Sequence, residues 1–99
     1  MEIKIQSIHF DATEKLEAFI EKKVAKLEKS LDDIQKVEVQ LKVVKPATAL
    51  NKEVALTATV PGRALRVEKV SDTFEEAIDL GIDSLRVQLQ KIKEKSRNY

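Results

Sequence analysis

The sequence lacks several residue types that carry chemistry in other proteins. It has no cysteine, no tryptophan and a single histidine, His9, among its 99 residues. Without cysteine there is no disulfide framework, no thiolate nucleophile and no thiolate metal site, which fits a reducing compartment. With one histidine, neither a metal site of the usual spacings nor a histidine-containing triad can be built. We therefore expect no catalytic residue, no metal and no cofactor.

Glycine and proline are also scarce, with two of each. No glycine-rich phosphate loop can be assembled, and no linker, repeat or low-complexity tract divides the chain. We predict a single domain over residues 1–99, compact up to about residue 93, with a basic C-terminal tail from about residue 94. Every Asp and Glu fits a helix cap, a helix face or a strand surface, so we expect no enzyme and no small-molecule substrate.

No apolar run approaches the roughly 20 residues that span a bilayer. The chain opens on the alternating stretch EIKIQSI, without the basic and apolar regions of a secretory signal. We expect a cytoplasmic protein with no membrane partner. The formal net charge is +1, so any attraction to a polyanion must come from segregation of charge within the molecule.

Alternating apolar and polar residues predict strands near the start of the chain, over residues 36–44 and 53–60, and over roughly residues 64–70. Ile3 and Ile5 face inward in the first of these. The inward side chains of the middle two are Val37, Val39, Leu41, Val43, Val54, Leu56, Ala58 and Val60. Pro61 and Gly62 predict a tight turn before the last strand, with a positive φ at the glycine.

Apolar residues at helical period predict helices over residues 11–31 and 71–99. Asp11 with Glu14, and Thr73 with Glu76, have capping-box spacing. The apolar positions are Leu16, Phe19, Ile20, Val24, Leu27 and Leu31, then Phe74, Ala77, Ile78, Ile82, Leu85, Leu89 and Ile92. Gly81 costs about 1 kcal/mol relative to alanine inside a helix, and a close crossing against the other helix or the sheet would explain it.

These elements follow the order β-α-β-β-β-α. Each strand has one polar face, which is typical of a sheet that is covered on one side only. We therefore predict an α+β fold in which a four-stranded sheet packs both helices on one face and leaves the other face in water.

The first helix sorts its charges around its axis. At about 100° per residue, Lys15, Lys22, Lys26 and Lys29 fall within roughly 60° of one another. Glu14, Glu17, Glu21 and Glu28 share a similar arc on the other side of the apolar stripe, and Lys23 lies at the apolar margin nearest the basic arc. A helix built for solubility would place Glu and Lys four apart instead. Two interpretations stay open: a solvated face, or a face turned toward a polyanion.

The second helix sorts its charges along its axis. Acidic residues fill its first half, and its second half holds Arg86, Lys91, Lys93, Lys95 and Arg97. The helix macrodipole favours this order without any partner. If the helices pack side by side, this basic end would join the basic arc at one groove. Weaker candidates are strand cations, which we expect on the wet face: Lys42, Lys45, Lys52, Arg63, Arg66 and Lys69.

Aromatic residues are few, with three Phe and one Tyr. Phe19 and Phe74 belong to core stripes, Phe10 precedes a cap and Tyr99 is terminal. Because no platform for stacking bases is available, a nucleic-acid partner would be structured RNA bound through its shape and its phosphates.

Several stretches together resemble the short HPF/YfiA family of ribosome hibernation factors, the ribosome-associated translation inhibitors also called ribosomal subunit interface proteins. They are MEIKIQS, FDATEKLEAFIEKKVAKLEK, VEVQLKVVK and TFEEAIDLGIDSLRVQLQKIKEK. The resemblance implies a β-α-β-β-β-α fold and binding to 16S rRNA in the decoding channel of the small ribosomal subunit. Such binding would block tRNA and mRNA access and inhibit translation under stress or in stationary phase.

The resemblance also implies which basic residues contact rRNA. Lys22, Lys23, Lys26, Lys91, Lys93 and Lys95 match the family's basic helix positions. The basic arc adds Lys15 and Lys29, and Arg86 adds a cation next to Ser84 and Val87, which replace two usual cations. Relatives often have DMY before the second helix, where this chain has DTF. Long relatives add a linker and a C-terminal domain that dimerises ribosomes, and this sequence stops at Tyr99, so the resemblance does not imply that it dimerises ribosomes by itself. We expect a monomer away from the ribosome.

Two other functions stay open as alternatives. A double-stranded RNA-binding module has a similar layout, but it needs a basic helix N-terminus, and the second helix here begins acidic. A protein-interaction module would use Leu80 and Val87, which lie seven residues apart on the polar side of the second helix.

Overall fold

The computed structural model describes residues 1–30, 33–44 and 50–97, with side chains up to residue 94. The predicted core residue Leu31 and the loop residues Lys45 and Pro46 therefore lie outside the described residues. The elements, in order, are β1 (Glu2–Ile8), α1 (Glu14–Ala25), the 3-10 helix η1 (Lys26–Lys29), β2 (Lys36–Val43), β3 (Lys52–Val60), β4 (Arg63–Ser71) and α2 (Phe74–Arg97).

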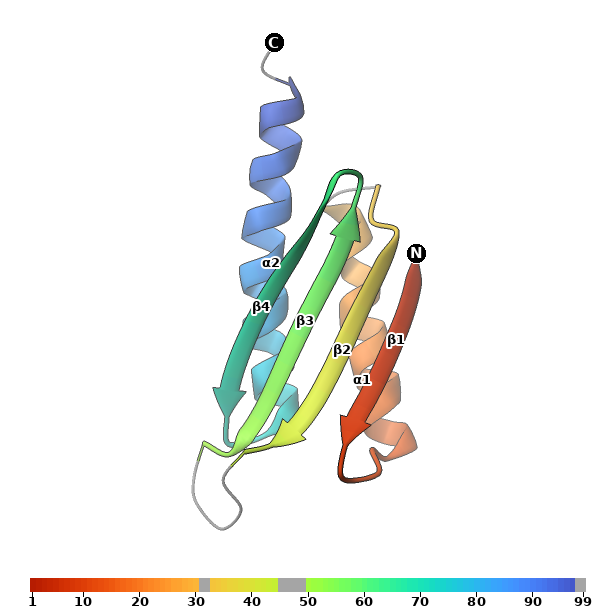
Figure 1. Ribbon diagram of the computed structural model, residues 1–99, viewed down its shortest axis with the longest axis vertical. Helices are drawn as coiled ribbons and strands as arrows, with labels where there is room; N and C mark the ends of the chain where they lie inside the picture. The colour runs from red at the N-terminus through yellow and green to blue at the C-terminus, as the bar shows by residue number, and fades with distance from the viewer. Residues whose placement is uncertain (31–32, 45–49, 98–99) are drawn as a thin grey trace.

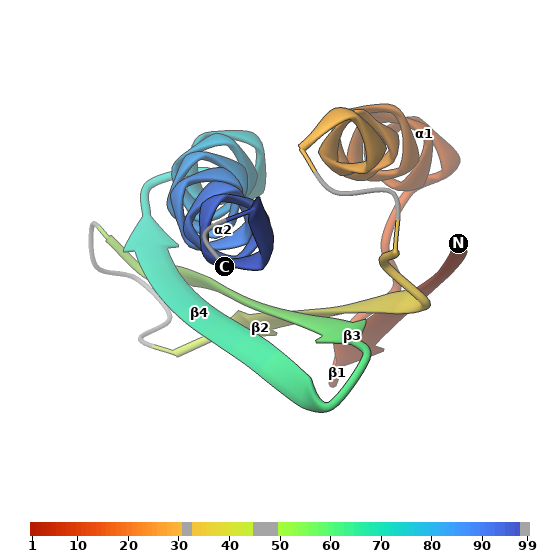
Figure 2. The same cartoon turned by 90° about the horizontal axis from the view of Figure 1, so that it is seen from above.

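The strands form one sheet in the order β1-β2-β3-β4. β1 and β2 are parallel and are joined through α1, whereas β2, β3 and β4 pair antiparallel. Both helices cover the same face of the sheet (Figures 1 and 2). They run in the same direction, and the last turns of α2 extend past the β3–β4 hairpin (Figure 1). The predicted α+β fold is confirmed.

The core lies between the sheet and the helices, as the alternation predicts. Val37, Val39 and Leu41 of β2 are at most 1% exposed. Gly81 explains how closely α2 approaches the sheet, because a Cβ atom there would lie 2.7 Å from Cδ1 of the fully buried Leu56. The predicted close crossing is therefore against the sheet. Glycine at position 81 permits this close packing, and the packing offsets the poor helix propensity of glycine.

Threonines cap both α-helices. The Thr73 hydroxyl accepts a hydrogen bond from the Glu76 backbone N–H at 3.1 Å, as the spacing predicts. For α1 the prediction of Asp11 was wrong, because Thr13 accepts from the Leu16 N–H at 3.1 Å instead. The helix begins two residues later than Asp11 would allow. Before the helix, the Phe10 ring stacks on the Phe74 ring, with the ring centres 5.2 Å apart.

An α-helix was predicted over residues 11–31, but α1 ends at Ala25. From Lys26 the chain winds as the 3-10 helix η1, with the Lys26 N–H bonded to the Lys23 carbonyl and the Ser30 N–H to the Leu27 carbonyl. The tighter turn still keeps Leu27 at 0% exposure and also buries Ser30.

The tight turn predicted at Pro61 and Gly62 is confirmed. Val60 pairs with Arg63 across these two residues, and the φ of Gly62 is 83°.

Candidate nucleic-acid interface

The segment α1–η1 turns one side to the core and leaves its lysines in water. Ile20, Val24 and Leu27 are each 0% exposed. The lysines of the predicted basic arc are all exposed: Lys15, Lys22, Lys26 and Lys29. Side chains three apart eclipse in a 3-10 helix, so the change of winding aligns Lys26 with Lys29.

Lys23 shows which way the basic arc faces. Its ammonium lies 3.3 Å from Oδ1 of Asp79 on α2 and 5.5 Å from the centre of the Phe19 ring. Lys23 and Phe19 therefore mark the side of α1 that faces α2. Because the basic arc adjoins this side, its lysines border the space between the helices, and the acidic arc lies on the side away from α2.

A hollow joins the end of η1 to the second half of α2. It has a volume of about 280 Å³ and is lined by Lys29, Ser30, Gln90, Lys93 and Glu94. The predicted groove between the basic arc and the basic end of α2 is therefore present at this point. The polar lining by Ser30 and Gln90 was missed in the sequence, since neither residue stands out from the pattern of charges.

The cations of α2 divide between two flanks. Arg86 lies about 20° from Lys93 around the helix axis, on the flank that faces α1, and its guanidinium is 3.9 Å from Asp83. Lys91 is exposed about 160° from Lys93, on the opposite flank. The backbone of Lys95 is helical, but its side chain lies outside the described residues.

We give the name inter-helix basic cluster to five exposed cations on the facing flanks of the two helical segments, of which only Lys29 and Lys93 line the hollow: Lys22, Lys26, Lys29, Arg86 and Lys93. Two other candidates stand apart from it. Lys23 is engaged with Asp79 and Phe19, and Lys15 lies in the first turn of α1, about two turns before Lys23. The space between the helices therefore carries Lys29, Lys93 and Glu94 at the hollow, and the Lys23–Asp79 ion pair nearer the start of α2.

The expectation that strand cations lie on the wet face was wrong for three residues. Val54 points into the core and pairs with Lys69, so Lys69 shares the helix-side parity. Lys52 and Arg63 have the same parity, each near the end of a strand. Charges directed inward on an edge strand such as β4 discourage pairing with another chain. For Arg63 and Lys69, which lie on β4, the register is therefore consistent with a structural role, whereas Lys52 lies on the central strand β3.

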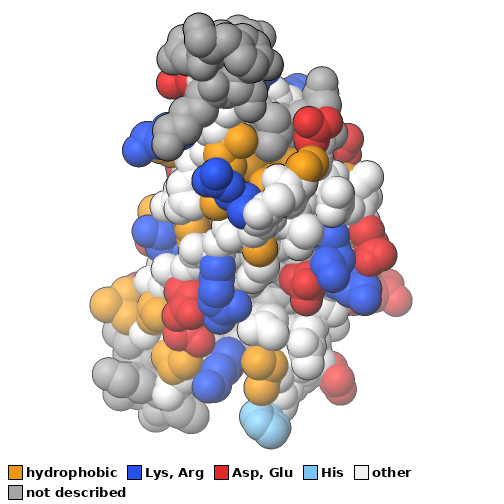
Figure 3. All heavy atoms as spheres, turned by 45° about the horizontal axis from the view of Figure 1, so that its top comes forward, with side chains coloured by type: hydrophobic (Ala, Val, Ile, Leu, Met, Phe, Trp, Pro, Cys, Tyr) orange, Lys and Arg blue, Asp and Glu red, His pale blue; other side chains and the backbone are white. Residues whose placement is uncertain are grey.

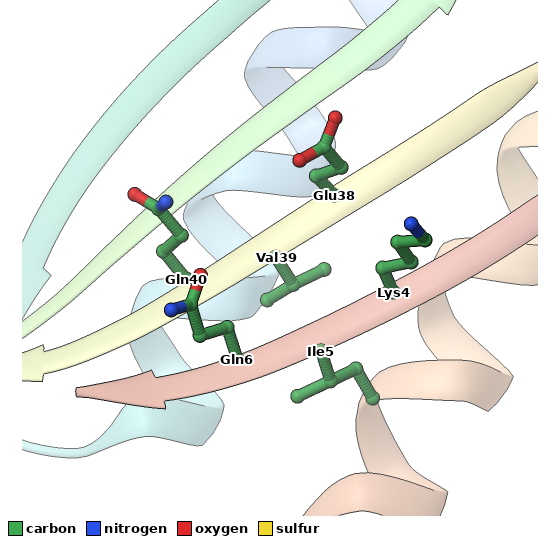
Figure 4. A pocket seen from close by; sticks show the side chains of 6 residues that line it. All are labelled: Lys4, Ile5, Gln6, Glu38, Val39 and Gln40. Carbon is green, nitrogen blue, oxygen red and sulfur yellow. The ribbon is translucent and has the colours of Figure 1, made fainter.

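The wet face of the sheet mixes charges of both signs. Arg66 bonds Glu68 at 3.0 Å and Lys36 lies 3.1 Å from Glu38, and Figure 3 shows blue and red side chains next to one another on this side of the molecule. A hollow of about 370 Å³ lies over β1 and β2, where Lys4 and Gln6 stand beside Glu38 and Gln40 (Figure 4). Although this hollow is larger, its charges are balanced, so it is a poor site for a polyanion.

Within residues 1–30, 33–44 and 50–97, no three His, Cys, Asp or Glu side chains are grouped so that they could hold a metal ion. No helix among these residues has the length and apolar character needed to cross a membrane.

Known proteins are similar to this chain over nearly its whole length. Residues 3–97 match the protein family described as Sigma 54 modulation protein / S30EA ribosomal protein. The ribosome hibernation promoting factor of Pseudomonas putida is 32% identical over 98 residues, which is 99% of this chain and 92% of that protein. The factor of the same name from Azotobacter vinelandii is 33% identical over 95 residues, covering 96% and 85% of the two chains.

Solved structures share the fold. The N-terminal domain of Thermus thermophilus Protein Y superposes with a TM-score of 0.81 at 25% identity, over 93% of this chain and 99% of that one. A ribosomal subunit interface protein from Coxiella burnetii gives a TM-score of 0.83 at 24% identity, over 95% and 99%. The arrangement of sheet and helices is therefore a common property of these chains.

Proposed function

Because this chain belongs to the Sigma 54 modulation protein / S30EA ribosomal protein family, we propose that it acts in ribosome hibernation by binding the small ribosomal subunit. Its target is 16S rRNA in the decoding channel, and its role is to block tRNA and mRNA and so inhibit translation in stationary phase or under stress. The observation that carries the proposal is the match over residues 3–97, together with relatives named as ribosome hibernation promoting factors.

The inter-helix basic cluster is the part of the surface best suited to contact rRNA. Lys29 and Lys93 approach one hollow from two elements, and Lys26 is aligned with Lys29 on η1. Phosphates bind to such clusters through charge and hydrogen bonds, and counterions are released as they do. Lys15, Lys23, Lys91 and Lys95 remain candidates with smaller contributions. Lys23 pairs with Asp79, Lys15 lies at the start of α1 about two turns from Lys23, and Lys91 lies on the other flank of α2.

The mechanism needs no chemistry at a reacting atom. A compact domain with extents of 51 × 23 × 19 Å that occupies the channel excludes other occupants sterically. The role is non-enzymatic, is exercised in the cytoplasm where translation takes place, and requires one copy of the chain per subunit. Since phosphate contacts provide the attraction, affinity should fall steeply as salt is raised.

Co-sedimentation with purified small subunits tests this proposal. We expect the chain to pellet with the subunits at low salt, to be displaced by tRNA bound at the decoding site, and to dissociate as the salt concentration rises. Association that ignores both tRNA and salt would overturn the mechanism. A generic RNA duplex serves as the competitor for the double-stranded RNA-binding alternative, which the acidic residues Glu75 and Glu76 in the first turn of α2 disfavour.

A further inference from the structure

The hollow between η1 and the second half of α2 contains a carboxylate that phosphate binding does not explain. Lys29 and Lys93 line it together with Ser30, Gln90 and Glu94. A site that held phosphate alone would be weakened by a carboxylate, because charges of the same sign repel at short range. The acidic side chain therefore suits a ligand that also brings a hydrogen-bond donor to the hollow.

Glu94 has no evident role in folding. It is exposed and lies near the C-terminal end of α2, where the helix dipole disfavours negative charge. Among the residues whose side chains the structure describes, no ion pair engages its carboxylate, so neither Lys29 nor Lys93 neutralises it. It follows Gln90 by four residues, so the two side chains are neighbours on one helix face. Its carboxylate is available to a ligand.

Ser30 provides a second polar group without a partner at the same place. The residue is 6% exposed, and within the described part of the chain no hydrogen bond involves its hydroxyl. In the same part of the chain, no side-chain oxygen that lacks a partner is sealed from solvent. The small exposed part of Ser30 therefore includes its hydroxyl, at the hollow that the residue lines. A hydroxyl can both donate and accept a hydrogen bond.

The hollow suits one sugar–phosphate unit better than a base or a separate small molecule. Its volume of about 280 Å³ lies at the lower limit of small-molecule pockets, which begin at about 300 Å³. None of the described residues that line it is aromatic, so a base would find no stacking platform. The ribose of RNA, by contrast, carries a 2′-hydroxyl that donates and accepts hydrogen bonds close to the backbone phosphates.

We propose that this hollow binds the ribose of one RNA nucleotide through its 2′-hydroxyl while Lys29 and Lys93 hold the adjoining phosphates. Glu94 accepts a hydrogen bond from the 2′-hydroxyl, and the Ser30 hydroxyl and the Gln90 amide donate to ribose oxygens. This inference rests on the proposed function and names the chemical group of rRNA that the site selects. Phosphates are common to RNA and DNA, so the contact with the 2′-hydroxyl makes the site specific for RNA.

Two substitutions of Glu94 in the full chain test the contact by the order of their affinities for purified small subunits. Glu94→Gln removes the charge and keeps an oxygen that accepts a hydrogen bond, whereas Glu94→Ala removes both. If Glu94 accepts from the 2′-hydroxyl, Glu94→Ala binds roughly threefold to tenfold more weakly than the wild type and than Glu94→Gln. If phosphates alone occupy the hollow, both variants bind equally and more tightly than the wild type, which overturns the inference.

Glu21→Ala is the matched control, because Glu21 is exposed on the acidic arc of α1, on the side away from α2. It measures what the loss of one distant negative charge does to affinity, and we expect a change below about twofold. Alanine and glutamine are both favourable near the end of a helix, so neither Glu94 variant should lose stability. A loss from Glu21→Ala as large as that from Glu94→Ala would overturn the assignment to the hollow.

Interference by 2′-deoxynucleotides tests the RNA side of the contact. Small subunits are reconstituted on 16S rRNA transcripts that carry sparse 2′-deoxynucleotides, and those retained by immobilised chain are compared with unselected subunits. We expect at least one position where the 2′-deoxy substitution lowers retention by the wild type roughly threefold or more and leaves retention by Glu94→Ala unchanged. Identical interference patterns for the two chains overturn the inference.

These outcomes differ from a failure of the proposed function. Wild-type chain that does not co-sediment with small subunits contradicts the proposed function itself. Wild-type chain that co-sediments, while Glu94→Ala binds as tightly as Glu94→Gln and the interference patterns are identical, contradicts only the contact with the 2′-hydroxyl.

Discussion

The two helical segments pack on the same sheet but distribute their charges differently. In α1 and η1 the signs separate around the axis, so lysines line one side and glutamates another along the whole segment. In α2 the signs separate along the axis, with Glu75 and Glu76 in the first turn and the basic residues in the last turns. The first pattern gives up favourable pairs four residues apart, whereas the second follows the helix dipole.

The difference indicates which pattern needs an explanation beyond stability. Charges ordered along α2 are accounted for by the helix itself, and only packing beside η1 gives Lys93 a neighbour of equal sign across the hollow. Charges ordered around α1 create a lateral surface that contributes nothing to folding. The charge pattern of α1 is therefore the better evidence that a partner binds. The position of Lys93 on α2 then shows where the two segments share a site, at the hollow beside Lys29.

The largest expected effect comes from reversing cations of both segments at once. Lys26→Glu, Lys29→Glu and Lys93→Glu together should lower affinity for small subunits roughly a hundredfold or more, at about 1 kcal/mol for each lost charge-assisted contact. The slope of log affinity against log salt should decrease by about 0.7 to 0.9 per contact. Filter binding across a salt series measures both quantities.

The control for that variant is Lys42→Glu, on the wet face of β2. It changes the net charge by the same amount per substitution but lies away from the basic cluster. Affinity should stay within about threefold of the wild type, since only long-range charge is altered. Equal losses from Lys42→Glu and from a single cluster substitution would show that net charge, and not the groove, governs binding.

A valine substitution should cost much more where α2 packs closely on the sheet, at Gly81, than at an exposed position of α1, at Ala18. Gly81→Val should lower the free energy of unfolding by about 2 kcal/mol or more, because the new side chain must displace Leu56 in a filled core. Ala18→Val, at an exposed position of α1, should cost about 0.5 kcal/mol through helix propensity alone. Urea denaturation followed by circular dichroism compares them, and equal costs would argue against the tight crossing.

The two flanks of α2 can be separated with substitutions two residues apart. Lys93→Glu should weaken binding to small subunits roughly tenfold, because it places a carboxylate beside Lys29 where a phosphate would lie. Lys91→Glu, about 160° away around the axis, should weaken it less than about threefold. Comparable losses from both would indicate that RNA surrounds the end of α2 on two sides.

The helix caps should contribute almost equally in α1 and α2. Thr13→Ala and Thr73→Ala each remove a side chain that accepts a backbone N–H at 3.1 Å, and each should cost about 1 kcal/mol of unfolding free energy. Asp11→Ala should be nearly neutral. Thermal unfolding measures the three variants, and a larger loss for Asp11 than for Thr13 would contradict the observed start of α1.

The smallest expected effect concerns the ion pair that joins the helices. Lys23 and Asp79 are both well solvated, with side-chain exposures of 32% and 52%. A double-mutant cycle through Lys23→Ala and Asp79→Ala should therefore give a coupling free energy below about 1 kcal/mol. A coupling of several kcal/mol would mean that the pair, and not the buried apolar residues, sets the distance between α1 and α2.

Local patterns in the sequence were sufficient for most of the fold. Period-two and helical repeats of apolar residues located the strands and helices, because burial on one side imposes those periods directly. The Pro61–Gly62 turn and the Thr73 cap followed from backbone chemistry within a few residues. The cap of α1 did not, since Asp11 and Thr13 both suit that role by residue type, and the tertiary structure, in which Phe10 stacks on Phe74, has Thr13 as the cap.

The sequence by itself determined the charge-sorted face over Glu14–Ala25, because residues on one α-helix keep their angular positions wherever that helix packs, whereas the 3-10 winding of η1 was not predicted. Tertiary structure alone decided that Lys29 meets Lys93 at one hollow, that Lys91 faces elsewhere, and that Lys69 and Lys52 share the helix side of the sheet. Those outcomes depend on which flank of α2 lies against η1 and on the register of distant strands. Neither is set by neighbouring residues, since both follow from the packing of the complete core.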